Sequence, residues 1–194
     1  MRLRVGVAIA VLLLTGACGP DTPTDEPSPT ESPAASEPAV EELVAAPGAI
    51  GPVQVGMTLD EANATGLFEP RETPEDDPCK DAYGSIQWKA PHTEYLMVGA
   101  NKDKITVLGI RDTVKTAKGV GVGSTLADVE AAYPDAKVED SVALGSTIYR
   151  NDGEKWLGMG FEETPDEIKD DSKVLFMEAT LGEKPTTYLS GCSY

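Results

Sequence analysis

One short pattern occurs twice in this chain of 194 residues, and it constrains the fold more than any other feature. The segment VQVGMTLD begins at Val53 and the segment VGVGSTLA begins at Val120. The glycines of the two copies, Gly56 and Gly123, are therefore 67 positions apart. Self-similarity at a fixed spacing indicates duplicated structural units, so the part of the chain that folds is expected to contain two related halves.

Each copy leads into a predicted helix. A threonine is followed three positions later by an acidic residue in both copies: Thr58 with Glu61, and Thr125 with Asp128. This is the spacing of a capping box, in which the hydroxyl and the carboxylate satisfy free amides at a helix start. The first helix is expected to stop at Gly66 and the second just before Pro134, because glycine suits a helix end and the residue before proline avoids the helical region.

Further matches follow at spacings that change only in expected loops. They pair Gly84 and Ser85 with Gly145 and Ser146, Trp88 with Tyr149, Tyr95, Leu96 and Gly99 with Trp156, Leu157 and Gly160, and Ile105–Ile110 with Val174–Ala179. The fold class predicted is α+β, with two tandem repeats over 47–116 and 117–194. Each repeat is expected to be a short capped helix followed by a three- to four-stranded antiparallel sheet.

The opening phrase of each copy, Gly56-Met57-Thr58 and Gly123-Ser124-Thr125, resembles that of the small envelope lipoprotein domains of the BamE type. Tandem copies resemble the fold of the beta-lactamase inhibitory protein. The resemblance implies binding of proteins through an open sheet face, with no catalysis. This chain departs from the inhibitor pattern in having few aromatic residues and a single available cysteine pair.

Alternation along the second strands predicts which face would meet a partner. Two apolar rows are expected to face the core: Leu96, Val98 and Ala100, and Leu157, Met159 and Phe161. The opposite face then shows Tyr95, Met97 and Trp156 beside glycines, and Tyr, Trp and Met are enriched at binding hot spots. Trp88 and Tyr149 are further candidates whose facing the sequence leaves open. The alternative is that these aromatic side chains pack under loops or against the sheet of the other repeat.

Composition excludes several classes of function. The formal net charge is −17, and no Lys/Arg cluster is present, so a nucleic-acid partner is excluded. One histidine and three cysteines cannot build a usual four-ligand zinc site. His92 lies in a predicted turn and is expected at the surface, and no nucleophile elbow or phosphate-binding loop accompanies it. We therefore expect no enzymatic activity, no metal and no cofactor.

The N-terminus predicts export. Arg2 and Arg4 precede an apolar run, Val5–Leu14, that is too short to span a bilayer. It ends in Leu14-Thr15-Gly16-Ala17-Cys18, which resembles the lipobox of bacterial lipoproteins, with Thr15 in place of the usual aliphatic residue. The resemblance implies a signal peptide over 1–17, diacylglycerol and palmitate on Cys18, and anchoring at the extracytoplasmic face of the cell membrane. The alternative is an ordinary cleaved signal.

The segment after the signal differs in composition from everything that follows it. Residues 18–46 contain six prolines and seven acidic residues, but no Lys, Arg or aromatic residue. Such a segment cannot form a core, so it is predicted to be a disordered tether between the lipid and the folded part. A proline-rich ligand for another domain is the alternative.

Two cysteines remain after lipidation, and export places them in an oxidising compartment. Cys79 lies in the extra loop of the first repeat and Cys192 near the end of the second. We predict that they form a disulfide that joins the repeats, worth about 4 to 5 kcal/mol in the chain-entropy model. Two free thiols are the alternative.

These observations predict a lipid-anchored protein-binding module without catalysis, whose protein partner the sequence does not identify. A structural envelope scaffold of BamE type is one alternative. A small-ligand or calcium carrier is another, and two acidic clusters are the candidates for calcium: Glu75–Asp77 with Asp81, and Glu162–Glu167 with Asp170 and Asp171. Neither stretch has the ligand spacing of an EF-hand, so we interpret both as solvated loop charge.

Overall fold

The computed structural model describes residues 43–72, 85–101, 103–141 and 145–186. All of them lie in one compact unit, Ser36–Tyr194. This unit is α+β, with short helices and mostly antiparallel sheet. In chain order the elements are β1 (Val44–Ala46), β2 (Ala49–Ile50), β3 (Val53–Gln54), α1 (Leu59–Ala64), β4 (Phe68–Pro70), β5 (Ile86–Trp88), η2 (His92–Glu94), β6 (Leu96–Asn101), β7 (Lys104–Ile110), β8 (Lys115–Thr116), α3 (Leu126–Ala132), β9 (Val138–Asp140), β10 (Ser146–Asp152), β11 (Lys155–Phe161) and β12 (Phe176–Leu181).

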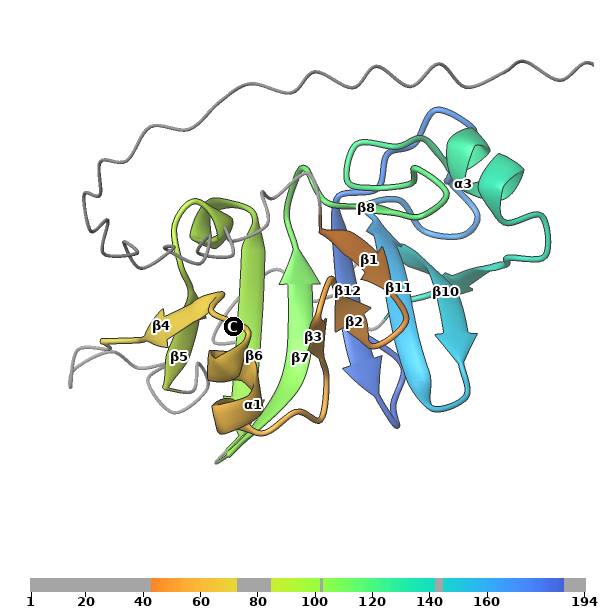
Figure 1. Cartoon of the computed structure of the whole chain (residues 1–194). Coiled ribbons are helices and arrows are strands. Elements are labelled where there is room, and N and C mark those ends of the chain that lie inside the picture. The colour runs from red at the N-terminus through yellow and green to blue at the C-terminus, as the bar shows by residue number, and fades with distance from the viewer. Residues whose placement is uncertain (1–42, 73–84, 102, 142–144, 187–194) are drawn as a thin grey trace, which may run out of the picture. The chain divides into compact units, whose positions relative to one another are not determined.

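A six-stranded antiparallel sheet forms the centre, in the order β6-β7-β12-β11-β10-β9 (Figure 1). β7 and β12 pair in the middle of this sheet, with Gly109 directly opposite Glu178. β4 and β5 form a separate two-stranded sheet beyond β6, and β3-β2-β1-β8 form a small sheet of four. Figure 1 shows α1 and β1–β3 in front of the central sheet, on one of its faces.

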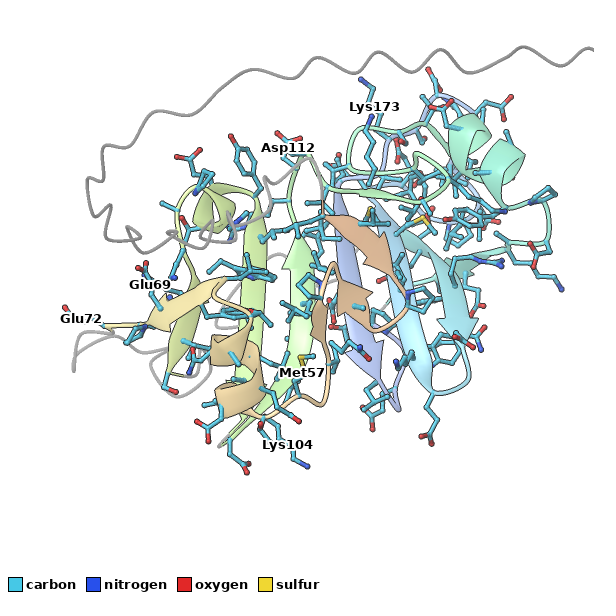
Figure 2. The ribbon with its side chains drawn as sticks, viewed as in Figure 1. Met57, Glu69, Glu72, Lys104, Asp112 and Lys173 are labelled. Atoms are coloured by element: carbon cyan, nitrogen blue, oxygen red, sulfur yellow. The ribbon has the colours of Figure 1, made fainter. Side chains whose placement is uncertain are left out.

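The two copies of the glycine-threonine pattern make the same backbone hydrogen bonds. The amide of Gly56 donates to the carbonyl of Ile105, and the amide of Gly123 donates to that of Val174, each at 2.8 Å. Both glycines have positive φ, 92° and 84°, which L-residues rarely adopt. Thr58 forms an isolated antiparallel β-bridge with Lys104, and Thr125 forms one with Lys173. Figure 2 labels both lysines, Lys104 at the bottom of the view and Lys173 at the top.

Both predicted capping boxes are confirmed. Thr58 Oγ1 accepts from the amide of Glu61 while Glu61 accepts from the amide of Thr58. Thr125 and Asp128 repeat the arrangement at α3. The helix ends are confirmed as well: α1 ends before Gly66, which has a φ of 78°, and α3 ends just before Tyr133 and Pro134.

A single hydrophobic cluster lies between the central sheet and the elements that cover it. Both predicted core rows are buried. Ala62 of α1 and Val129 of α3 are 0 % exposed and belong to the same cluster. Ile50 and Val53 of the small sheet also join it, so the helices and the small sheet share one core with one face of the central sheet.

The folded part begins earlier than the sequence predicted. Leu43 and Ala45, which fall in the predicted tether, are each 2 % exposed. β1 pairs in parallel with β8, Val44 opposite Lys115 and Ala45 opposite Thr116. The boundary at residue 46 is therefore wrong by at least four residues, because a partner strand far along the chain orders a segment whose local composition favours disorder. The rest of the predicted tether lies outside the described residues.

Candidate protein-binding face

The face of the central sheet that points away from the core is called the outer face here. Directly paired residues of an antiparallel sheet share a face, so the strand registers define its members. They are Met97 and Gly99 of β6, Val107 and Gly109 of β7, Phe176, Glu178 and Thr180 of β12, Trp156, Gly158 and Gly160 of β11, and Thr147 and Tyr149 of β10. Three of the five residues predicted for partner binding, Met97, Tyr149 and Trp156, lie on this face.

An aromatic pair occupies one end of the outer face. The rings of Tyr149 and Trp156 meet edge to face with their centroids 6.3 Å apart, and both residues are half-buried. Lys184 Nζ lies 4.7 Å from the centroid of Tyr149 and 5.7 Å from that of Trp156. The same ammonium group forms an ion pair with Glu139. The pair therefore has an aromatic partner and a cation on the same face, and each such contact restricts the rotamers of the rings.

Glycines allow neighbouring side chains to pack directly over the backbone in the middle of the outer face. The ring of Phe176 lies over Gly109, where a β-carbon would approach Phe176 Cζ to 2.7 Å. Gly158 stands opposite Glu178, whose side chain is 3 % exposed. Neither Phe176 nor Glu178 stands out in the sequence as a candidate for binding. Their alternation with the core residues of β12 is the signal that would have placed them on this face.

The β6 end of the outer face adjoins a hollow of about 210 Å³. Arg71, Gln87 and Arg111 line it together with Met97. Arg111 Nε donates to Met97 Sδ at 2.8 Å, which holds the guanidinium beside the thioether. Two guanidinium groups make this hollow suited to a carboxylate or phosphate.

Trp88 is not part of the outer face, and the prediction for it is wrong. Its side chain is 1 % exposed, and its ring lies 4.5 Å from that of Phe68. β5 pairs with β4 in a sheet of its own, Phe68 opposite Trp88, and this sheet buries Trp88, whereas β10 joins the central sheet and leaves Tyr149 on the outer face. Tyr95 is half-buried and packs against the core cluster at its edge.

The prediction that His92 lies at the surface is also wrong. His92 begins the 3₁₀ turn η2 and is 2 % exposed. Its ring meets Trp88 edge to face at a centroid distance of 6.1 Å. Trp88 Nε1 and His92 Nδ1 have no hydrogen-bond partner within the described part of the chain. η2 contacts the strands on either side of it in the chain, β5 and β6, and this local packing brings His92 against Trp88.

Three carboxyl groups at the helix ends have lowered pKa values. The backbone amide and hydroxyl of Thr58 donate to Glu61 and hold its pKa below its ordinary value. Thr125 lowers the pKa of Asp128 in the same way. A hydrogen bond from Arg150 lowers the pKa of Asp135, whose Oδ2 lies 3.0 Å from the guanidinium nitrogen. These charges stabilise helix starts and a loop, so we assign them no part in a reaction.

Several predicted sites lie outside the described residues. They are Cys18, Cys79, Cys192 and the acidic stretch Glu75–Asp77. The other acidic stretch forms a turn, in which Glu167 accepts from the hydroxyl of Thr164 at 2.9 Å. Within residues 43–72, 85–101, 103–141 and 145–186, no three His, Cys, Asp or Glu side chains gather as metal ligands would. The helices in these ranges include none long and apolar enough to cross a membrane.

No protein-family model, curated protein or solved structure matches this chain.

Proposed function

We propose that this protein is a lipid-anchored, extracytoplasmic module that binds a protein partner through the outer face and catalyses no reaction. One observation carries the proposal. Tyr149 and Trp156 form a half-buried, edge-to-face aromatic pair on the outer face, beside Gly158. Tyr and Trp side chains are enriched at binding hot spots.

We infer a duplicated architecture from features that recur in the two halves of the folded part. The turns at Gly56 and Gly123 share positive φ and carry hydrogen bonds to matched carbonyls. A capped helix follows each turn at the equivalent position. β7 pairs with β12, and the paired residues Gly109 and Glu178 are 69 positions apart, which is the spacing at which the two strands match in sequence. We infer two copies of one helix-and-meander unit, joined edge to edge so that their strands form one extended face.

The membrane attachment is proposed from the sequence. Cys18 follows small residues at the end of an apolar segment, and a diacylglycerol on its sulfur with a further acyl chain would give stable anchoring. Replacing Cys18 by serine is expected to move the protein from the membrane fraction to the soluble fraction. The check is mass spectrometry of the mature N-terminus, which would contradict the proposal if the membrane-bound wild type carried no acyl chain.

Photo-crosslinking tests the binding face. A photoreactive amino acid placed at Met97 or at Trp156 in intact cells is expected to give one common adduct of defined mass. The matched controls are Asn63 of α1 and Glu130 of α3, which are exposed on the helices. Adducts from the helix positions alone, or none from the outer face, would contradict the proposal.

The hollow beside β6 favours a second candidate function, the binding of a small anion. Its two arginines are the observation behind it. Titration of the protein with inorganic phosphate or acetate, followed by the NMR signals of Arg111 and Met97, distinguishes the candidates. Saturable shifts that vanish in the Arg111→Gln variant favour the anion, and their absence leaves the protein partner as the proposed ligand.

A further inference from the structure

The aromatic pair on the outer face already holds a cation, and that cation comes from the chain itself. Lys184 Nζ lies over both rings, 4.7 Å from the centroid of Tyr149 and 5.7 Å from that of Trp156. The two ring planes meet at 89°. A cation within about 6 Å of a ring centroid is attracted by the π-system, and aromatic rings grouped around an ammonium are a known means of binding organic cations.

Strand register brings a carboxylate to the same place. Tyr149 of β10 and Trp156 of β11 are diagonal neighbours across the two strands. Glu139 of β9 pairs with Thr147 of β10 and therefore shares the outer face. Its carboxylate forms the ion pair with Lys184. Two rings and a carboxylate thus converge on one ammonium group, and together they provide cation–π attraction, an opposite charge and a hydrogen-bond acceptor.

Lys184 is held only by exposed contacts. The side chains of Lys184 and Glu139 are 45 % and 46 % exposed, and exposed ion pairs and cation–π contacts contribute little to stability. Lys184 lies beyond the end of β12, after a bend at Gly182, whose φ is 83°. Its four-carbon stem is flexible. The ammonium group can therefore leave the rings without any change in the central sheet.

We propose that Tyr149, Trp156 and Glu139 form a binding site for a lysine side chain of the protein partner, and that Lys184 occupies this site in the free protein. The inference rests on the proposed function for the source of the cation, and it adds the chemistry of the partner. The resident Lys184 shows which cation fits the site, a primary ammonium group on a flexible stem.

The charge of the protein also favours a basic partner. The formal net charge is −17, and a field of one sign attracts a partner of the other sign during diffusional encounter. Exposed acidic residues adjoin the site along the chain: Asp140, Glu154 and Glu183. A partner segment that carries lysine therefore meets a surface of complementary charge, and one of its ammonium groups replaces that of Lys184 on the rings.

Titration of the isolated protein tests the site. The probe is lysine with blocked α-amino and carboxyl groups, at constant ionic strength, and the readout is the NMR signal of the indole N–H of Trp156. In the Lys184→Met variant the dissociation constant is expected to be on the order of three- to tenfold lower than in the wild type, because an internal competitor reduces the fraction of open sites. Adding Tyr149→Leu to this variant should abolish the saturable shift.

The matched control is Lys155→Met, which removes the same charge from the position next to Trp156. Lys155 alternates with Trp156 along β11 and donates to Gln54 Oε1 at 2.9 Å on the opposite side of the sheet. This variant should bind the probe as the wild type does. Blocked norleucine, which has the four-carbon stem without the ammonium group, should give no saturable shift in any variant.

Two results of the titration would overturn the inference. One is an equal dissociation constant for Lys184→Met and the wild type. The other is tighter binding of tetramethylammonium than of blocked lysine, because only the lysine ammonium can donate a hydrogen bond to Glu139. Lys184→Gln gives the same comparison if the amide spectrum shows that the methionine variant does not fold.

These titrations need no partner, so their failure leaves the crosslinking test of the proposed function in force. A further measurement joins the two. In intact cells, Lys184→Met should raise the yield of the partner adduct from a photoreactive amino acid at Met97, whereas Lys155→Met should not. If Lys184→Met leaves the adduct yield unchanged, the partner does not place a lysine on the rings, and the inference is overturned while the proposed function stands.

Discussion

The segments that follow Gly56 and Gly123 begin alike and then differ. Both start with a glycine turn and a threonine-capped helix. After α1, β4 and β5 form a sheet of their own, in which Phe68 and Trp88 are paired and buried. After α3, β9 and β10 extend the central sheet, and Tyr149 is left on the outer face. Matched sequence therefore accounts for the start of each segment, while the sheet that the later strands join decides whether an aromatic residue lies in the core or on the outer face.

The largest expected effect concerns the two aromatic residues. Trp88→Ala should lower the free energy of unfolding by about 3 to 5 kcal/mol, because it leaves a cavity in the core. Tyr149→Ala should cost about 1 kcal/mol or less, since Tyr149 is half-buried and away from the core. Urea denaturation of both variants gives the two values. If both variants lost the same free energy of unfolding, the assignment of Trp88 to the core and Tyr149 to the outer face would be wrong.

The turn glycines should give a smaller and unequal effect. Alanine at Gly56 or Gly123 is expected to cost about 1 to 2 kcal/mol, because both have positive φ. Gly56→Ala should cost more, since its new methyl group would lie 3.1 Å from Leu181 Cδ2, whereas none of the atoms described lies within 4 Å at Gly123. Thermal unfolding compares them. A larger loss at Gly123 would contradict this packing argument.

The helix caps should respond equally. Thr58→Ala and Thr125→Ala each remove the hydroxyl that accepts from the third helical amide, at a cost of about 1 kcal/mol. Serine at either position keeps the oxygen and should restore most of the stability. Chemical denaturation of the four variants measures this. If one alanine variant is neutral, the two caps do not contribute alike.

The smallest of the expected effects is that of acid, which should weaken the hydrogen bonds of the two capping boxes. The pKa values of Glu61 and Asp128 are lowered in the folded state from ordinary values of 4.5 and 3.8. The unfolded chain therefore takes up protons first as the pH falls, so this stabilisation is present above about pH 4.5 and is lost below it. Glu61→Gln with Asp128→Asn should flatten the fall in Tm between pH 6 and pH 3.

A matched control for the acid experiment removes two carboxyl groups from the same helices without touching a cap hydrogen bond. Asp60→Asn with Glu130→Gln serves this purpose, because both residues are exposed beside the capping residues. The control should lose stability in acid as the wild type does. If both double variants show the same pH dependence, the caps are not its source.

Local signals predicted the helix starts, the helix ends and the buried rows of β6 and β11, because each depends on residues within a few positions. The same reasoning placed Met97 and Trp156 on one face, and it left the facing of Tyr149 open. It failed for Trp88, since β5 joins β4 in a separate sheet where Trp88 is buried, and for His92, since the turn residue packs against the buried ring of Trp88.

The sequence by itself determined where the helices begin, which strand positions alternate toward the core, and how strongly acidic the chain is. Those properties follow from hydrogen bonding and periodicity between near neighbours. Only the tertiary structure decided that Val44–Ala46 is a strand, that Phe176 and Glu178 are buried on the outer face, and that Lys184 crosses Tyr149 and Trp156. Each of these depends on segments far apart in the chain, whose pairing is chosen by the total burial that the fold achieves and not by any local pattern.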